Sequence, residues 1–240
     1  MPQSQATFAL EFNGKDSYVD LPTLRYDGSH PITLEATVVA HQAEAVSVVI
    51  GDAAQTGMAL QFPSRRSKLG NFIACDGTEF CVVFTREPVQ TGQRHHVAGV
   101  LEGTRIGLFV DGKIQEAGQL KGSYRKGRDP FLIGGLPPSP DVVRSLFSGV
   151  IDELRVSKVA RYSGDFVPLV RFEPDKDTLA LYHFDEGSGD VLNDASGNNH
   201  HGKIVNAKWV PGIGGARPQS RSKTSAKKPK TTAKSSETKP

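Results

Sequence analysis

The sequence predicts an all-β protein, a two-sheet antiparallel β-sandwich or jelly roll. Apolar and polar residues alternate in many short runs, which is the pattern of strands with one buried face. Glycine, proline, asparagine and aspartate interrupt these runs about every ten residues, as turns do. Helical periodicity is weak, with single turns predicted at 140–147 and 158–162. Many short strands and few helices are typical of a β-sandwich.

In each predicted strand, every second side chain points to the same face, and one of the two faces is apolar. In 150–156 this rule places Asp152 on the face of Leu154 and places Ile151 on the opposite face. The pair Asp111-Gly112 predicts a tight hairpin turn after the strand at 106–110. In chain order, the predicted strands are 8–12, 33–38, 58–62, 80–84, 106–110, 150–156 and 178–184.

The composition divides the chain into one predicted domain, residues 8–213, and a basic low-complexity tail, residues 214–240. Within the tail, 217–240 holds eight Lys or Arg and one Glu, so the rest of the chain has 21 basic and 25 acidic residues. The tail has no Leu, Ile, Val or aromatic residue, which predicts disorder. Two interpretations stay open, a solvated linker or salt-dependent contact with a polyanion. The lack of aromatic residues for base stacking disfavours nucleic acid.

The sequence contains no run of eighteen apolar residues, so no transmembrane segment is predicted. The N-terminus lacks the basic and apolar regions of a signal peptide. If Met1 is the true start, these features predict a cytoplasmic protein.

Five segments carry recognisable motifs: ALEFNGKDSYVDLP (9–22), PITLEATVVA (31–40), HHVAGVLEGTRIGLFVDGKIQ (95–115), FLIGG with FSGVIDELRVSKVARY (131–135, 147–162) and LALYHFDEGSGDVLNDASGNNHHGKIVNAKW (179–209). Together they resemble the laminin-G-like jelly-roll modules of the concanavalin-A-like lectin/glucanase superfamily. The resemblance covers residues 8–213 and implies the sandwich fold and an extracellular location, which conflicts with the missing export signal. It leaves the function open, because this fold carries lectins, hydrolases, receptors and adhesins alike.

The order of these motifs predicts a circular permutation. In many related modules the segment that resembles 179–209 comes first, whereas here it comes last. If the sandwich is the same, Trp209 should lie close to Phe8, because permutation requires adjacent chain ends.

Catalytic residues are not predicted. The resemblance to glucanases implies two carboxylates on one strand face, where one acts as nucleophile and the other as acid. Asp152 and Glu153 are adjacent and so are expected on opposite faces. The histidine pairs at 95–96 and 200–201 are adjacent too, which is poor geometry for zinc.

Calcium is the metal that the sequence leaves open, with no cofactor required. The resemblance implies that such sandwiches often hold one structural or ligand-bridging calcium, for which Asp152, Asp185, Asp194 and Asn198 are the candidate oxygen donors. The alternative is that these side chains bind backbone NH groups and hold turns in place. Asp152 is expected to be buried and therefore to have a partner.

Cys75 and Cys81 flank a predicted hairpin loop, residues 77–79, and would then face each other across two strands within reach of a disulfide. A secreted protein would oxidise them, whereas a cytosolic one would keep two free thiols.

The predicted function is non-enzymatic binding of carbohydrate or protein, through loops at the rim of the sandwich or through a concave sheet face. Arg65 and Arg66 form a basic loop that fits an anionic glycan. The alternatives are a structural or protein-interaction domain without a small ligand and, third, a glycoside-active enzyme.

Overall fold

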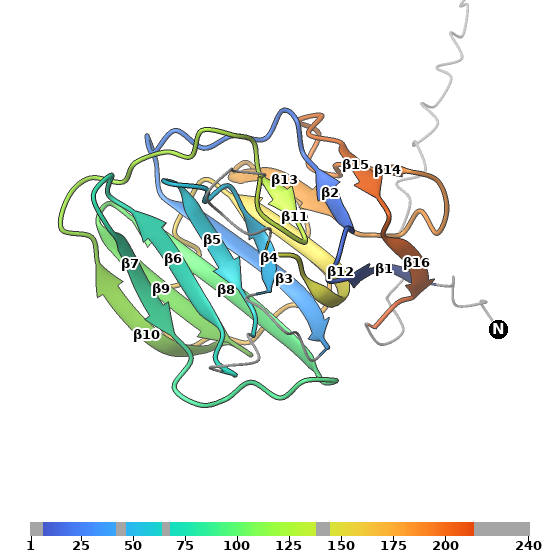
Figure 1. The fold of residues 1–240 in the computed structure, drawn as a ribbon, viewed down its shortest axis with the longest axis horizontal. Helices are drawn as coiled ribbons and strands as arrows, with labels where there is room; N and C mark the ends of the chain where they lie inside the picture. Colours follow the sequence, from blue (N-terminus) through green and yellow to red (C-terminus); the bar gives the residue numbers. More distant parts are fainter. Residues whose placement is uncertain (1–6, 42–46, 64–67, 138–144, 214–240) are drawn as a thin grey trace, which may run out of the picture.

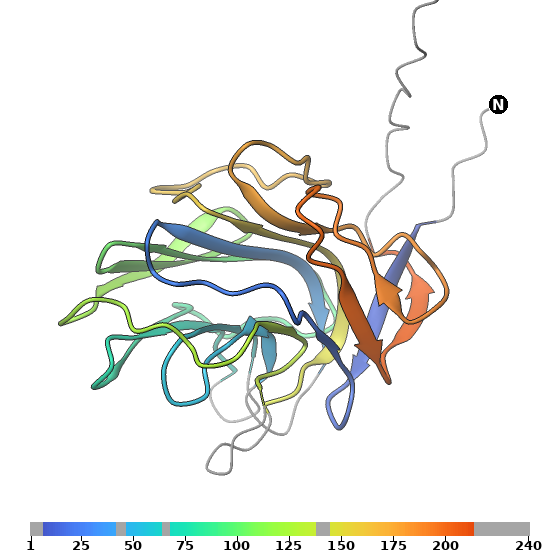
Figure 2. The ribbon, with the colours of Figure 1, turned by 90° about the horizontal axis from the view of Figure 1, so that it is seen from above.

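The computed structural model describes residues 7–41, 47–63, 68–137 and 145–213. In these ranges every regular element is a strand, and the strands form two antiparallel sheets that lie face to face (Figures 1 and 2). The predicted β-sandwich is therefore confirmed. None of the described residues forms a helix long and apolar enough to cross a membrane. The loop with Arg65 and Arg66 and the tail from residue 214 lie outside the described residues.

Each sheet contains eight strands. The first sheet has the order β10 (Lys113–Gln119), β9 (Arg105–Val110), β8 (Arg94–Glu102), β3 (Ile32–Ala40), β12 (Ser148–Ser157), β1 (Phe8–Asn13) and β16 (Lys208–Pro211), and β13 (Thr178–Tyr182) pairs with β12. The second has the order β14 (Val191–Leu192), β15 (Gly202–Val205), β2 (Tyr18–Asp20), β11 (Leu132–Ile133), β4 (Val48–Gly51), β5 (Met58–Gln61), β6 (Asn71–Cys75) and β7 (Phe80–Phe84).

The hydrophobic core fills the space between the two sheets, as the alternation predicts. Leu34, Ala36 and Val38 of β3 are fully buried in one continuous cluster with Leu60 of β5 and Phe72 of β6. Burial of these side chains from both sheets is the main favourable contribution to the stability of a sandwich.

The N-terminal and C-terminal strands of the sandwich are neighbours. β1 pairs with β16, with Leu10 opposite Trp209 and Phe8 opposite Pro211. The predicted proximity of Trp209 and Phe8 is therefore confirmed, and β16 completes the first sheet beside β1 (Figure 1). The two ends of the domain are adjacent, as a circular permutation requires.

A β-bulge in β12 changes the predicted faces of this strand. The register against β3 shifts between Ile151 and Glu153, so Asp152 is the extra residue. As a result, Ile151 and Leu154 both enter the core, although strict alternation placed them on opposite faces, and Asp152 does not share the face of Leu154. The bulge also marks the point where the partner of β12 changes from β1 to β13.

The two cysteines do not face each other, and this prediction was wrong. Cys75 is opposite Phe80, whereas Cys81 is opposite Ala74, so the cysteines are one register position apart and point to opposite faces. The loop between the strands has four residues because Asp76 accepts hydrogen bonds from the backbone NH groups of Thr78 and Glu79. Both cysteines are free thiols in the structure.

We expect two titratable thiols in the purified full chain. When it is denatured without reductant, a maleimide reagent should label both cysteines, because the register keeps their sulfur atoms apart. Prior reduction should not change the labelled mass. Labelling that appears only after reduction would contradict the register of β6 and β7.

A segment without strands, residues 158–177, covers the outer face of the first sheet; we call it the strap (Figure 2). Its rings Tyr162 and Phe166 pack against a small cluster on that face that includes Phe109. The Phe166 NH donates to the carbonyl of Gly112, 2.8 Å away, and a Cβ at Gly112 would overlap the Phe166 carbonyl oxygen. The hairpin turn at Asp111-Gly112 is confirmed, with φ values of 50° and 74°, but the helical turn at 158–162 is not.

Candidate functional site

An open polar pocket of about 490 Å³ lies at the rim of the sandwich, where the strap returns to β13. We call it the rim pocket. Three stretches of chain form it: the end of β12 and the strap, the start of β13, and the loop that follows β14. The side chains that line it are Lys158, Asp175, Lys176, Thr178, Leu179, Ser196, Asn198 and His200.

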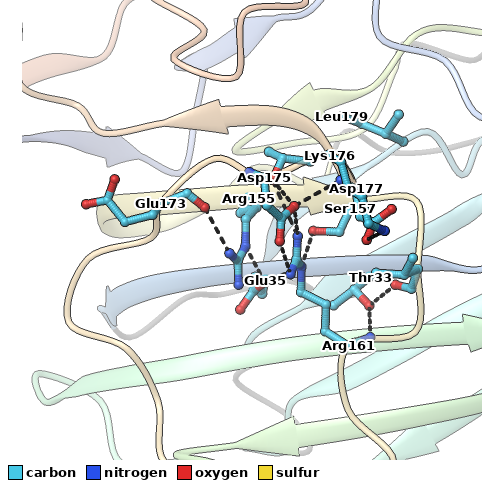
Figure 3. A network of polar contacts seen from close by, with 12 residues as sticks. Thr33, Glu35, Arg155, Ser157, Arg161, Glu173, Asp175, Lys176, Asp177 and Leu179 are labelled. Carbon is cyan, nitrogen blue, oxygen red and sulfur yellow. Dashed lines mark hydrogen bonds and ion pairs between the residues drawn. The ribbon is translucent and has the colours of Figure 1, made fainter.

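One wall of the rim pocket is held by an ion pair (Figure 3). Both terminal nitrogens of Arg161 donate to Asp175, at 2.9 and 2.8 Å. Asp175 also accepts hydrogen bonds from the Thr178 hydroxyl and the Asp177 NH. The hydrogen bond from Arg161 is the main reason why the pKa of Asp175 is well below its usual value. The Asp175 carboxylate is therefore ionised at neutral pH and paired with Arg161.

The opposite wall is a turn centred on Asp194. The Asp194 carboxylate, 8% exposed, accepts hydrogen bonds from the NH groups of Leu181 at 3.0 Å, Ser196 at 2.9 Å and His200 at 2.9 Å. Burial opposes ionisation of Asp194, but these bonds outweigh it and lower its pKa. Asp194 thus ties the loop after β14 to β13, which is the turn-holding role that was one of its two predicted alternatives.

Asn198 and the lysines supply the hydrogen-bonding surface of the rim pocket. Asn198 Nδ2 donates to the carbonyls of Thr178 and Leu179, which fixes the side chain against β13. Lys176 pairs with Asp177, 2.6 Å away. The described residues offer Lys158 no carboxylate partner, so its positive charge is uncompensated at the pocket.

The structure does not gather the four candidate calcium donors. Asp194 and Asn198 share one loop, but Asp185 pairs with Arg171 at 2.8 Å and Asp152 accepts a hydrogen bond from the Ile213 NH at 3.0 Å. The partner expected for buried Asp152 is therefore present. Within the described ranges, no three His, Cys, Asp or Glu side chains are grouped closely enough to hold a metal ion. Calcium binding stays a prediction.

A second polar network lies under the strap, and no motif of the sequence predicts it. Glu35 of β3, 0% exposed, accepts a hydrogen bond from Arg155 Nε at 2.8 Å (Figure 3). It also accepts hydrogen bonds from His96 Nε2 at 3.2 Å and from the Tyr162 hydroxyl at 2.7 Å. Complete burial disfavours the charged form of Glu35, but the bond from His96 and the charge of Arg155 outweigh it and lower the pKa.

The strap therefore closes the outer face of the first sheet over these residues. The alternation in 33–38 gave no indication that Glu35, on the face opposite Leu34 and Ala36, would be buried.

The described geometry is that of a jelly-roll sandwich with an open polar pocket at its rim. The chain belongs to the concanavalin A-like lectin/glucanases superfamily, whose laminin G family model matches residues 13–165. Most of the rim pocket lies beyond this match, in the segment that adds β13 to β16.

Solved structures with the same fold come from several organisms. A candidate carbohydrate-binding protein from Bacteroides ovatus has a TM-score of 0.69 at 18% identity, covering 87% of this chain and 61% of that chain. This chain thus spans less than two thirds of that protein.

Two further structures match at lower scores. The carbohydrate-binding module CBM40 of the Ruminococcus gnavus IT-sialidase, solved with α2,3-sialyllactose, has a TM-score of 0.52 at 14% identity, covering 64% of this chain and 91% of that one. The SAP-like pentraxin of Limulus polyphemus has a TM-score of 0.51 at 12% identity, covering 67% and 80%. At these identities the likeness shows the fold alone. No curated protein sequence matched the chain.

Proposed function

We propose that the chain is a non-enzymatic carbohydrate-binding module that holds its ligand in the rim pocket. The observation that carries this proposal is an open pocket whose hydroxyl, amide and amine groups stand on two walls with fixed geometry. Sugars are recognised through several directed hydrogen bonds, and rigid donors and acceptors reduce the entropy lost on binding.

The charge of the rim pocket favours a sugar that carries an acidic group. Lys158 and Lys176 both line it; Lys176 is paired with Asp177, so the uncompensated charge is that of Lys158. The carboxylate among the lining residues, Asp175, is neutralised by Arg161. The Ruminococcus gnavus module was solved with sialyllactose, an acidic sugar of this kind. Glycoside hydrolysis generally needs two carboxyl groups about 5 to 10 Å apart, and Asp175 does not supply that pair.

A protein-interaction module is the second candidate. The strap exposes three large apolar residues close together in the chain, Val167, Leu169 and Val170. Exposed apolar surface of this kind is typical of a contact with another protein.

The rim pocket is tested by removing its positive charge. We expect the variant with both Lys158→Ala and Lys176→Ala to bind an acidic oligosaccharide such as sialyllactose or a uronic acid oligomer at least about tenfold more weakly, because charge-assisted hydrogen bonds are lost. A glycan array followed by calorimetry measures this change.

Lys203→Ala is the matched control, since Lys203 is an exposed lysine on β15 outside the pocket. Repeating the array with EDTA tests the calcium prediction. Unchanged acidic glycan binding in the double variant would refute the rim pocket as the site. Absence of any glycan signal together with capture of a protein would favour the second candidate.

A further inference from the structure

A groove runs along the opposite edge of the sandwich, where β7 of the second sheet meets β10 of the first. It consists of two cavities of about 270 and 460 Å³, which share Thr85 and Gln115 and therefore adjoin. We call it the edge groove. It has no lining residue in common with the rim pocket, and Figures 1 and 2 place β7 and β10 far from β14 and β15.

A β-bulge in β10 shapes the middle of the edge groove. The register against β9 shifts between Ile114 and Glu116, so Gln115 is the extra residue. Bulges at sheet edges redirect a side chain. Here Gln115 turns toward the chain that leaves β7: Arg86 Nε donates to its carbonyl at 2.6 Å, and the Arg86 NH donates to its Oε1 at 3.3 Å.

The backbone at the end of this edge is already capped at two NH groups, which disfavours a peptide ligand there. An added peptide strand would need free NH and carbonyl groups along β7. The Phe84 NH, however, donates to Glu116 Oε2 at 2.7 Å, and the Arg86 NH is bound by Gln115.

The surface that remains combines uncharged polar groups with apolar ones. The amides of Gln90 and Gln93 and the hydroxyl of Thr85 stand beside Pro88, Val89 and Val110. At the open end the ring of Phe84 is 40% exposed. A sugar ring has an apolar face that stacks on an aromatic ring and hydroxyl groups that bind amides.

The charges along the edge groove differ from those of the rim pocket. His95 pairs with Asp111 at 2.7 Å. The other charged residues that line the groove are one cation, Arg86, and two carboxylates, Glu87 and Glu116. With no excess of positive charge, the groove does not favour an acidic ligand.

We propose that the edge groove is a second binding site, for a neutral oligosaccharide, with Phe84 as the stacking platform and glutamine amides as partners of the sugar hydroxyls. The proposal rests on the proposed function in that both treat the chain as a glycan-binding protein. It differs in the site and in the class of sugar.

The test is calorimetric titration of the full chain with three neutral probes: cellohexaose, xylohexaose and maltohexaose. We expect at least one to bind, and Phe84→Ala to weaken that binding at least tenfold. Gln93→Ala should weaken it too. Val82→Ala is the matched control, since Val82 lies two residues away on the same face of β7, is 37% exposed and does not line the groove.

Melting temperature and circular dichroism of each variant exclude misfolding, and Phe84→Leu keeps the apolar area while removing the ring. Loss of neutral-sugar binding in Phe84→Ala with no loss in the Lys158 and Lys176 double variant supports the edge groove. Equal binding by Phe84→Ala and the wild type, or no binding of any neutral probe, overturns it. Acidic-sugar binding reports separately on the rim pocket, so either site can fail alone.

Discussion

Replacing Glu35 by glutamine should lower the free energy of unfolding by about 3 to 5 kcal/mol, because it leaves Arg155 buried without its counter-charge. The Glu35 carboxylate also accepts hydrogen bonds from His96 of β8 and Tyr162 of the strap. The substitution therefore also weakens the contacts of β3 with β8 and with the strap. Urea denaturation measures the change in stability. We also expect a protease to cleave the strap faster in the variant than in the wild type.

The pH dependence of the same variant gives a second measurement. The pKa of Glu35 is lower in the folded chain than in the unfolded one, so its ionised form contributes stability above the unfolded pKa of about 4.3. That contribution is lost as the pH falls through the folded pKa. The stability difference between wild type and Glu35→Gln should therefore shrink below about pH 4.

Glu102→Gln serves as the control, because Glu102 is an exposed carboxylate at the end of β8. A stability loss under 1 kcal/mol in Glu35→Gln, or the same loss in both variants, would show that the buried ion pair does not hold the strap (surface pairs contribute about 0 to 1 kcal/mol).

Replacing Asp194 by alanine should cost about 2 to 4 kcal/mol of stability, since three backbone NH groups lose their acceptor in a mostly buried turn. The same change should abolish acidic-glycan binding, because Ser196 and Asn198 stand on the turn that Asp194 holds. Thermal unfolding and calorimetry measure the two effects on one preparation.

Asp190→Ala is the matched control for this turn, because Asp190 is an exposed aspartate just before β14. We expect EDTA to leave the melting temperature of the wild type unchanged, since hydrogen bonds already account for the role of Asp194. A melting temperature that rises with calcium in the wild type but not in Asp194→Ala would favour the calcium alternative instead.

The strands were predictable because alternation is a local property. The core faces of β1 and β3 follow from every second residue, and the motif order led to the pairing of β1 with β16. The bulge at Asp152 was not predictable, because nothing in the residues of β12 marks which of them stays unpaired. A single unpaired residue moves every later side chain of the strand to the opposite face. The predicted pairing of Cys75 with Cys81 was wrong for a related reason. The register of the hairpin depends on the length of its turn, which the hydrogen bonds of Asp76 set.

The candidate site was predictable only in part. Asp194 and Asn198 stood out because a turn rich in Asp, Asn and Gly was visible in the sequence. Asn198 lines the rim pocket, and Asp194 holds the turn that carries it. Lys158 and Asp175 gave no signal, because they reach the pocket from a strap that looked like an ordinary loop. The edge groove was not visible either, since its walls come from β7, β10 and the start of β8.

By itself, the sequence determined the all-β class, the positions of seven of the sixteen described strands, the basic composition of the tail and the adjacency of the two ends of the domain. Only the tertiary structure decided which polar side chains are buried, which loops form pockets and which faces are closed. The physical reason is that these properties depend on contacts between distant segments. Arg155 and Glu35 are 120 residues apart in the chain, and neither residue indicates from its own neighbours that the strap will cover the pair.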